Sequence, residues 1–370
     1  MIDNKKFNSY QMVIFLLASM LGVGLLQLPS ILTEQVGNEG YIMPLISGVI
    51  SIVSVFFICY AGSIYGDRGL VDTSRFIYGK VLGIILIIPL WMIFFIACSV
   101  ESRLFVITIK LFLLDTTPIP AILLPFFLVL LFLLRGEFRH IGRFAEFVLP
   151  FVLFIVALLF ILVIPGCDFT DLLPLGQRTF TEYFKAIDGS VFSYLGVISL
   201  LVIYPYFKKT DLKSTFKTSA IAVGSISLIY SVTVGLCISK LGTAETKWLL
   251  YPTISLIKSA YIPGGFIERL EGLLMAIWVI LVFMTMAIAI YSMANIVLET
   301  FKFRDRRFIV TAIIPFIYIS ATSALSLLEV MDVSLISGYI LGTYSMFILP
   351  VLIGVGYRIK MKKRRGKGEV

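Results

Sequence analysis

Long apolar runs separated by short polar segments fill the chain from residue 11 to residue 357. A helix that crosses about 30 Å of hydrocarbon needs about 20 apolar residues. Ten runs are long enough or nearly so: 11–33, 41–65, 82–112, 119–135, 145–165, 187–206, 216–239, 267–298, 308–328 and 333–357. Backbone groups in lipid must be satisfied internally, and the runs lack the alternation of barrel strands. We therefore predict an all-α membrane protein of about ten transmembrane helices.

The composition favours the same class. Of the 370 residues, 59% are hydrophobic and 14% are charged, whereas soluble domains are usually about 45–50% apolar and about 25% charged. No polar block between the runs is long enough for a separate soluble domain. We expect a single transmembrane domain over residues 1–370, and the first run lacks the cleavage site of a removable signal peptide.

The basic residues predict the orientation. With the N-terminus in the cytoplasm, most of the 31 lysines and arginines fall at the cytoplasmic ends of the ten spans, as the positive-inside rule requires. Both termini are then cytoplasmic. The basic tail, 358–370, is either an ordinary stop-transfer flank or a binding segment for anionic lipid head groups. The opposite side holds only Lys110, Arg178, Lys185, Lys240, Lys247 and Lys258.

Two of the runs carry glycine in their middle, beside small or polar residues. Span 1 contains Gly-Val-Gly at 22–24, and span 6 contains Gly-Ser at 189–190 and Ser-Tyr-Leu-Gly at 193–196. Paired interruptions in the two halves of a transporter indicate a binding site near the midplane. The spans of the two halves also recur at a nearly constant offset, with five in each half. We predict a five-plus-five inverted repeat of the leucine-transporter type with broken helices 1 and 6.

The two repeats would cover about 11–165 and 187–357. Unwinding at the glycines would free backbone groups at membrane depth. The N-termini of the half-helices attract a carboxylate, and freed carbonyls attract an ammonium group or a cation, so a zwitterionic amino acid fits both. The alternative explanation is that the glycines only permit close packing of helices.

Four short motifs point to a family. They are GVGLLQLP at 22–29, Thr-Pro at 117–118, Tyr-Pro-Tyr at 204–206 and FIERLE at 266–271. In this order and over nearly the whole chain, they resemble the B subunits of bacterial spore germinant receptors. These subunits are permease-like members of the amino acid–polyamine–organocation superfamily. The first motif is shared by amino-acid permeases generally, and the last is more distinctive.

The resemblance implies a subunit in the inner membrane of the dormant spore. It implies binding of a small nutrient germinant, often an amino acid, and action together with a membrane A subunit and a lipoprotein C subunit. Binding would trigger ion and dipicolinate release rather than uptake. The family often has threonine at the position of Val23, so the same ligand is not implied.

The breaks and the fold predict a ligand site between spans 1, 3, 6 and 8. Thr285 is the only hydroxyl in the apolar middle of span 8, and it either faces the cavity or bonds the carbonyl four residues earlier in its own helix. The expected ligand-binding residues are Gly22, Val23, Gly24, Cys98, Val100, Tyr194, Leu195, Gly196 and Thr285.

Charged residues within the spans form a second group of candidates. Glu101 and Arg103 lie in span 3, and residues two apart on a helix do not face each other. Charges at membrane depth are usually paired. We expect a structural network between helices or a gating role, with partners at the start of span 8: Glu268, Arg269 and Glu271.

The sequence thus favours a germinant-receptor subunit. The alternatives are an amino-acid or cation-coupled transporter and a subunit that only scaffolds its partner. Motifs for phosphate loops, zinc hydrolases or serine nucleophiles are absent from the sequence, so we expect no enzyme activity, metal or cofactor. Membrane topology already accounts for the basic residues, and we expect no nucleic-acid binding.

Overall fold

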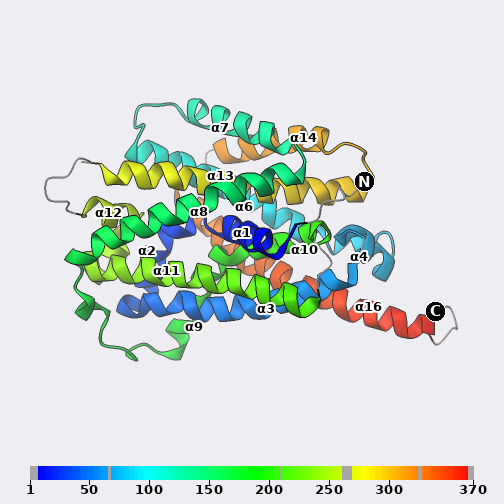
Figure 1. Cartoon of the computed structure of the whole chain (residues 1–370), viewed down its shortest axis with the longest axis horizontal. Coiled ribbons are helices and arrows are strands. Elements are labelled where there is room, and N and C mark those ends of the chain that lie inside the picture. The colour runs from blue at the N-terminus through cyan, green and yellow to red at the C-terminus, as the bar shows by residue number, and fades with distance from the viewer. Residues whose placement is uncertain (1–6, 66–67, 208–210, 261–268, 324–326, 366–370) are drawn as a thin grey trace.

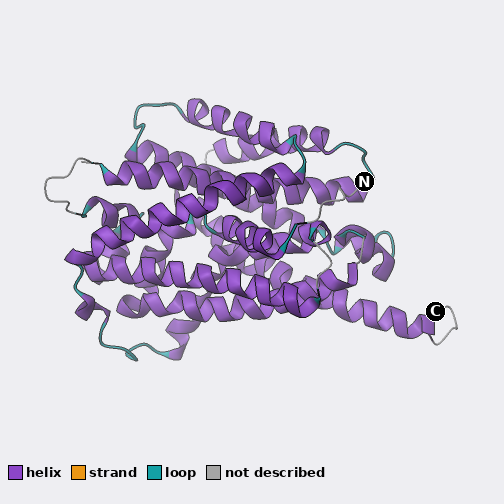
Figure 2. Ribbon diagram, in the orientation of Figure 1, coloured by secondary structure: helices purple, strands orange, loops and turns teal. Residues whose placement is uncertain are grey.

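The computed structural model of the chain is a bundle of helices (Figures 1 and 2). It describes residues 7–65, 68–207, 211–260, 269–323 and 327–365. Within these residues no β-strand forms, and an isolated bridge pairs Phe7 with Phe207. The predicted all-α fold is confirmed.

The first half of the chain contains a divided helix followed by longer helices. A 3-10 turn at Gly37–Ile42 and the short helix α4 (Leu70–Tyr78) connect them. The other elements are α1 (Ser9–Met20), α2 (Gly24–Val36), α3 (Met43–Tyr65), α5 (Leu82–Ile85), α6 (Ile88–Phe112), α7 (Ile119–Leu134) and α8 (Phe138–Val163).

The second half also begins with an interrupted helix. Its first span consists of α9 (Phe180–Val191), a 3-10 helix (Phe192–Ile198) and α10 (Ser199–Ile203). The last span combines α15 (Leu327–Ser337), π-helical turns over 338–348 and α16 (Leu349–Arg365). Between them lie α11 (Leu212–Trp248), α12 (Pro252–Lys258), α13 (Leu270–Phe301) and α14 (Arg306–Thr322).

Not every predicted span forms one continuous helix long enough to cross a membrane. Among the described residues, 7 helical stretches are long and apolar enough to cross a membrane. Span 1 is divided, and α7 and α14 have 16 and 17 residues. The count of ten therefore stays a prediction.

Two helices begin earlier than their apolar runs. α8 begins at Phe138 rather than at 145, and span 6 begins at Phe180 rather than at 187. Thr179 caps α9 in a capping box with Glu182, so a polar first turn is stable outside the apolar run. Apolar patterning cannot locate such an end.

The outer surface of the bundle is suited to lipid. Phe132 on α7, Phe147 and Phe154 on α8, and Phe316 on α14 are exposed by 85%, 84%, 66% and 64%. Burying a phenylalanine is worth about 1.5–3 kcal/mol in water, so an aqueous surface of this kind would be strongly unfavourable. The chain is a multi-pass membrane protein.

The divided spans lie in the middle of the bundle. α11 packs along α2 and α3 and contacts α1, whereas α13 packs against α6 and α14 (Figure 1). α7 and α14 lie together at the opposite edge of the bundle from α3. The half-helices of span 1 lie beside α11 and α13, and the interruption of span 6 contacts α1, α3 and the π-helical turns of the last span.

Spans 1 and 6 are tied together near both ends. Before α1, the Phe7 N–H donates to the Tyr206 carbonyl over 3.0 Å. Near the end of α2, the Arg178 Nε donates to the Val36 carbonyl over 3.2 Å, just before α9 begins. The two broken spans thus form one connected pair.

Candidate functional site

Span 1 is interrupted at 21–23, within the predicted Gly-Val-Gly element. Leu21 leaves the helical region at ψ 65°, and α2 begins at Gly24. The Gly22 N–H turns back to the Met20 carbonyl over 2.9 Å. The interruption is thus a tight local turn between two half-helices of 12 and 13 residues.

Hydroxyl groups from neighbouring helices hold the carbonyls released by this interruption. The Tyr230 hydroxyl on α11 donates to the Met20 carbonyl over 2.6 Å. The Thr285 hydroxyl on α13 lies 3.2 Å from the Ala18 carbonyl and 3.0 Å from the carbonyl of Leu281 in its own helix. Thr285 therefore makes the bond within α13 that was one of the two alternatives, and it also reaches span 1. These carbonyls already have protein donors.

Span 6 is tightened rather than unwound. Its middle is the 3-10 helix Phe192–Ile198, in which Gly196 allows close approach to span 1. A Cβ on Gly196 would lie 2.0 Å from the Ser19 carbonyl oxygen. Only a residue without a side chain fits so close to another backbone.

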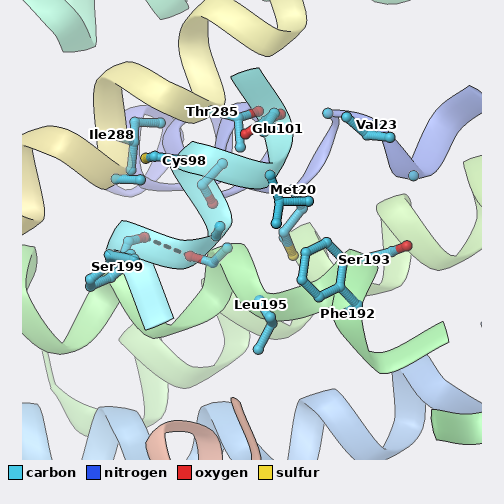
Figure 3. A pocket seen from close by; sticks show the side chains of 18 of the residues that line it. Met20, Val23, Cys98, Glu101, Phe192, Ser193, Leu195, Ser199, Thr285 and Ile288 are labelled. Atoms are coloured by element: carbon cyan, nitrogen blue, oxygen red, sulfur yellow. Dashed lines mark hydrogen bonds between the residues drawn. The ribbon is translucent and has the colours of Figure 1, made fainter. Parts of the chain in front are cut away.

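A cavity of about 80 Å³ lies between these interruptions and helices α6 and α13 (Figure 3). Most of its wall is apolar. The lining residues are Ser19, Met20, Gly22, Val23, Gly24, Ile93, Phe94, Ala97, Cys98, Val100, Glu101, Leu104, Phe192, Ser193, Leu195, Gly196, Ile198, Ser199, Thr285, Ile288 and Ala289.

Tyr194 is the one expected ligand-binding residue that does not line this cavity. Its hydroxyl donates to the Pro44 carbonyl over 2.7 Å and lies 3.1 Å from the Ser227 hydroxyl. Tyr194 therefore packs span 6 against α3 and α11. The structure brings the other eight together at the cavity: Gly22, Val23, Gly24, Cys98, Val100, Leu195, Gly196 and Thr285.

Glu101 lines the cavity, although the sequence favoured a network or gating role for it. A Cβ on Gly22 would lie 2.5 Å from Glu101 Oε1 and 3.2 Å from Thr285 Oγ1. In Figure 3 the Glu101 and Thr285 side chains lie together beside the break of span 1. Within the described residues, Glu101 forms no ion pair.

The other charged candidates lie elsewhere. Arg103 faces a separate pocket between α6, α14 and α15, beside Ser320 and Val330. Arg269 precedes α13 and is exposed, and Glu271 lies in the first turn of α13. Neither Glu101 nor Glu271 pairs with a described residue, and the expected network between span 3 and the start of span 8 stays a prediction. Glu268 lies outside the described residues.

Several cavity residues were not among the sequence candidates. Phe94, Ala97 and Leu104 line the cavity with Cys98 and Glu101. Positions three and four apart share one face of a helix, so the choice of Cys98 already implied Phe94, whereas Ala97 and Leu104 share a face with Glu101. Ser193, which flanks the glycine of span 6, was visible in the sequence as the polar member of that element.

The lining combines an apolar wall with one carboxylate and a few hydroxyls. It contains no lysine, arginine or histidine. No group of three or more histidine, cysteine, aspartate or glutamate side chains placed to hold a metal ion occurs in the described part of the chain. Such a site is suited to binding a small molecule by a few polar contacts.

A divided first span, an interrupted sixth span and a cavity between them define a membrane protein with the leucine-transporter fold. The chain belongs to the spore germination protein family, whose model matches residues 6–327. Spore germination protein A2 of Bacillus subtilis (strain 168) is 28% identical over 94% of this chain and 94% of its own length. Spore germination protein GerLB of Bacillus cereus is 25% identical, with coverage of 95% and 94%.

Two solved structures share the fold. MhsT in complex with L-phenylalanine matches with a TM-score of 0.66 at 11% identity, covering 94% of this chain and 97% of MhsT. Mhp1, a nucleobase-cation-symport-1 family transporter in a closed conformation with bromovinylhydantoin bound, gives 0.64 at 14% identity, with coverage of 97% and 94%. At these identities the likeness shows the fold alone.

Proposed function

We propose that this chain is the ligand-binding subunit of a spore germinant receptor and that its germinant occupies the cavity between spans 1, 3, 6 and 8. The carrying observation is that both helix interruptions and eight of the sequence candidates meet at one cavity. Membership of the spore germination protein family supports a role in germination, and the cavity supports the position of the germinant-binding site. A midplane cavity at broken helices is where proteins of this architecture hold their ligands.

The fold relatives support a small organic ligand. The MhsT structure contains L-phenylalanine and the Mhp1 structure a substituted hydantoin. Both ligands combine an apolar part with polar groups, and the cavity offers an apolar wall with a few polar groups. An amino acid is the germinant class that we propose.

The receptor context is also part of the proposal. The chain would act in the spore inner membrane with a membrane A subunit and a lipoprotein C subunit, with both of its termini in the cytoplasm. Basic residues of separate loops gather around one pocket at the end of the bundle near Phe7, which supports a single cytoplasmic face. They are Arg68, Arg135, Arg139, Arg304, Arg306 and Arg307. The five-plus-five repeat over 11–165 and 187–357 belongs to this proposal as well.

The first test removes the gene alone and measures dipicolinate release from spores across single amino acids and sugars. We expect the response to one nutrient class to disappear, while vegetative growth and solute uptake stay unchanged. Normal germination with reduced uptake of a solute by growing cells would instead identify a transporter and would overturn the receptor proposal.

The second test fills the cavity. Ala97→Leu adds three carbon atoms to the wall on α6, and we expect the germinant response to fall at least tenfold. The matched control is Ala312→Leu on the exposed side of α14, which should leave the response unchanged. Immunoblots of the spore membrane check that both variants accumulate. An unchanged response in accumulated Ala97→Leu would contradict the site.

A further inference from the structure

The cavity contains four polar groups that have no protein partner in the described part of the chain. They are the Glu101 carboxylate, the Ser193 hydroxyl and the backbone N–H groups of Val23 and Gly24. Polar groups in a protein interior are nearly always bonded to protein, water or ligand. Four of them around one small cavity indicate the polar pattern of its occupant.

The four groups divide into an acceptor and a set of donors. Glu101 Oε1 lies 2.5 Å from the Cβ position of Gly22, and Ser193 Oγ lies 2.7 Å from that of Gly24. The carboxylate and the hydroxyl therefore lie beside the two glycines of the break, and both line the same cavity.

The backbone carbonyls of the break are poor candidates for holding a positive charge. Met20 and Ala18 already accept hydrogen bonds from the Tyr230 and Thr285 hydroxyls. Among the lining residues, Glu101 is the remaining group that carries a full negative charge when it is ionised.

We propose that Glu101 recognises the ammonium group of the ligand, opposite the N-terminus of α2 and the Ser193 hydroxyl, where proteins of this architecture hold a carboxylate. This inference rests on the proposed function and assigns the two ends of the ligand. The donors lie at the N-terminus of α2, where the helix dipole favours an anion. In a site shielded from water, an ion pair with Glu101 is strengthened.

The direction of Glu101 on its helix supports recognition over a structural pair. Ala97 and Leu104, one turn before and after Glu101, both line the cavity. This face of α6 therefore points toward the ligand space, whereas Arg103 faces the pocket beside α15. A purely structural carboxylate at membrane depth would be expected to have a cationic partner.

The cavity volume suggests which probes to use. A water needs roughly 10–15 Å³ of such volume, so about 80 Å³ accommodates roughly five to eight groups of that size. L-alanine and L-valine are in this range. Their 2-hydroxy acids keep the carboxylate and side chain but replace the ammonium group with a hydroxyl.

The experiment measures dipicolinate release from spores carrying wild-type, Glu101→Gln or Glu101→Asp protein in the complete receptor. The probes are L-alanine, L-valine and the corresponding 2-hydroxy acids. Wild-type spores should respond to an amino acid at a concentration at least tenfold below that of its hydroxy acid. Glu101→Gln should lose sensitivity to the amino acid by roughly 30-fold to 1,000-fold, as for removal of one partner of a buried charge pair. Glu101→Asp should restore part of it.

The ratio of the two responses separates recognition from a structural role. If Glu101 had only a structural role, Glu101→Gln would lower the sensitivity to the amino acid and to the hydroxy acid equally. This outcome would overturn the inference. Equal potency of amino acid and hydroxy acid on wild-type spores would do so without any variant, even if Glu101→Gln failed to accumulate. A germinant without an amino group acting through this chain would also refute the role of Glu101 while leaving the receptor function intact. Only an unchanged response on gene deletion would refute that function.

Discussion

The interruptions of span 1 and span 6 look alike in sequence but differ in structure. Span 1 opens into a turn whose carbonyls are held by hydroxyls of α11 and α13. Span 6 continues as a 3-10 helix, and its glycine lies against the backbone of span 1. One glycine element therefore exposes backbone groups to the cavity, and the other permits contact. Gly196 fits the packing explanation considered for the sequence, and the ligand-site explanation for span 1 stays a prediction.

The largest effect should come from disturbing the contact between Gly196 and the Ser19 backbone. Gly196→Ala places a Cβ 2.0 Å from the Ser19 carbonyl oxygen, so one backbone must move, at a cost of about 3 kcal/mol. We expect little folded protein in the membrane, measured by immunoblot and by thermal stability in detergent. Gly224→Ala on α11 meets nothing within 4 Å and serves as the control. Equal abundance and thermal stability of the two variants would remove the distinction between the breaks.

A smaller effect should follow from loosening span 1. Tyr230→Phe removes the donor to the Met20 carbonyl, and a hydrogen bond between membrane helices is worth about 1 kcal/mol. The germinant concentration for half-maximal response should rise about fivefold, at near-normal protein levels. Tyr339→Phe, on an exposed tyrosine, is the matched control. An unshifted dose response would show that this bond does not shape the site.

The smallest effect should be that of Thr285. Its hydroxyl divides its proton between the Ala18 and Leu281 carbonyls, so Thr285→Val should cost only about 0.6 kcal/mol and shift the half-maximal concentration about threefold. Thr285→Ser keeps the hydroxyl and should remain close to wild type in the same assay of dipicolinate release. If valine and serine behave alike, the cavity shape rather than the bond determines the response.

The sequence located the break of span 1 well because glycine has a strong local effect. The Gly-Val-Gly element at 22–24 coincides with the interruption at 21–23. Cys98 and Val100 were chosen from the expected fold, and both line the cavity. The position of the break depends on backbone propensity, which is visible in a single sequence.

Side-chain direction in span 6 could not be obtained in this way. A 3-10 helix has 3.0 residues per turn rather than 3.6, so it turns its side chains differently. Tyr194 was expected at the ligand but points to Pro44 on α3. Glu101 shows a related limit, because the usual pairing of membrane charges favoured a protein partner over the cavity. Both positions depend on tertiary contacts that no local pattern records.

Contacts at three levels hold the two broken spans together. At one end, Phe7 before span 1 bonds to Tyr206 at the end of span 6, and at the other end Arg178 before α9 bonds to Val36 at the end of α2. In the middle, Gly196 lies against the Ser19 backbone. Because Gly196 has no free space against the Ser19 backbone, a displacement of span 1 at this point would press directly on span 6.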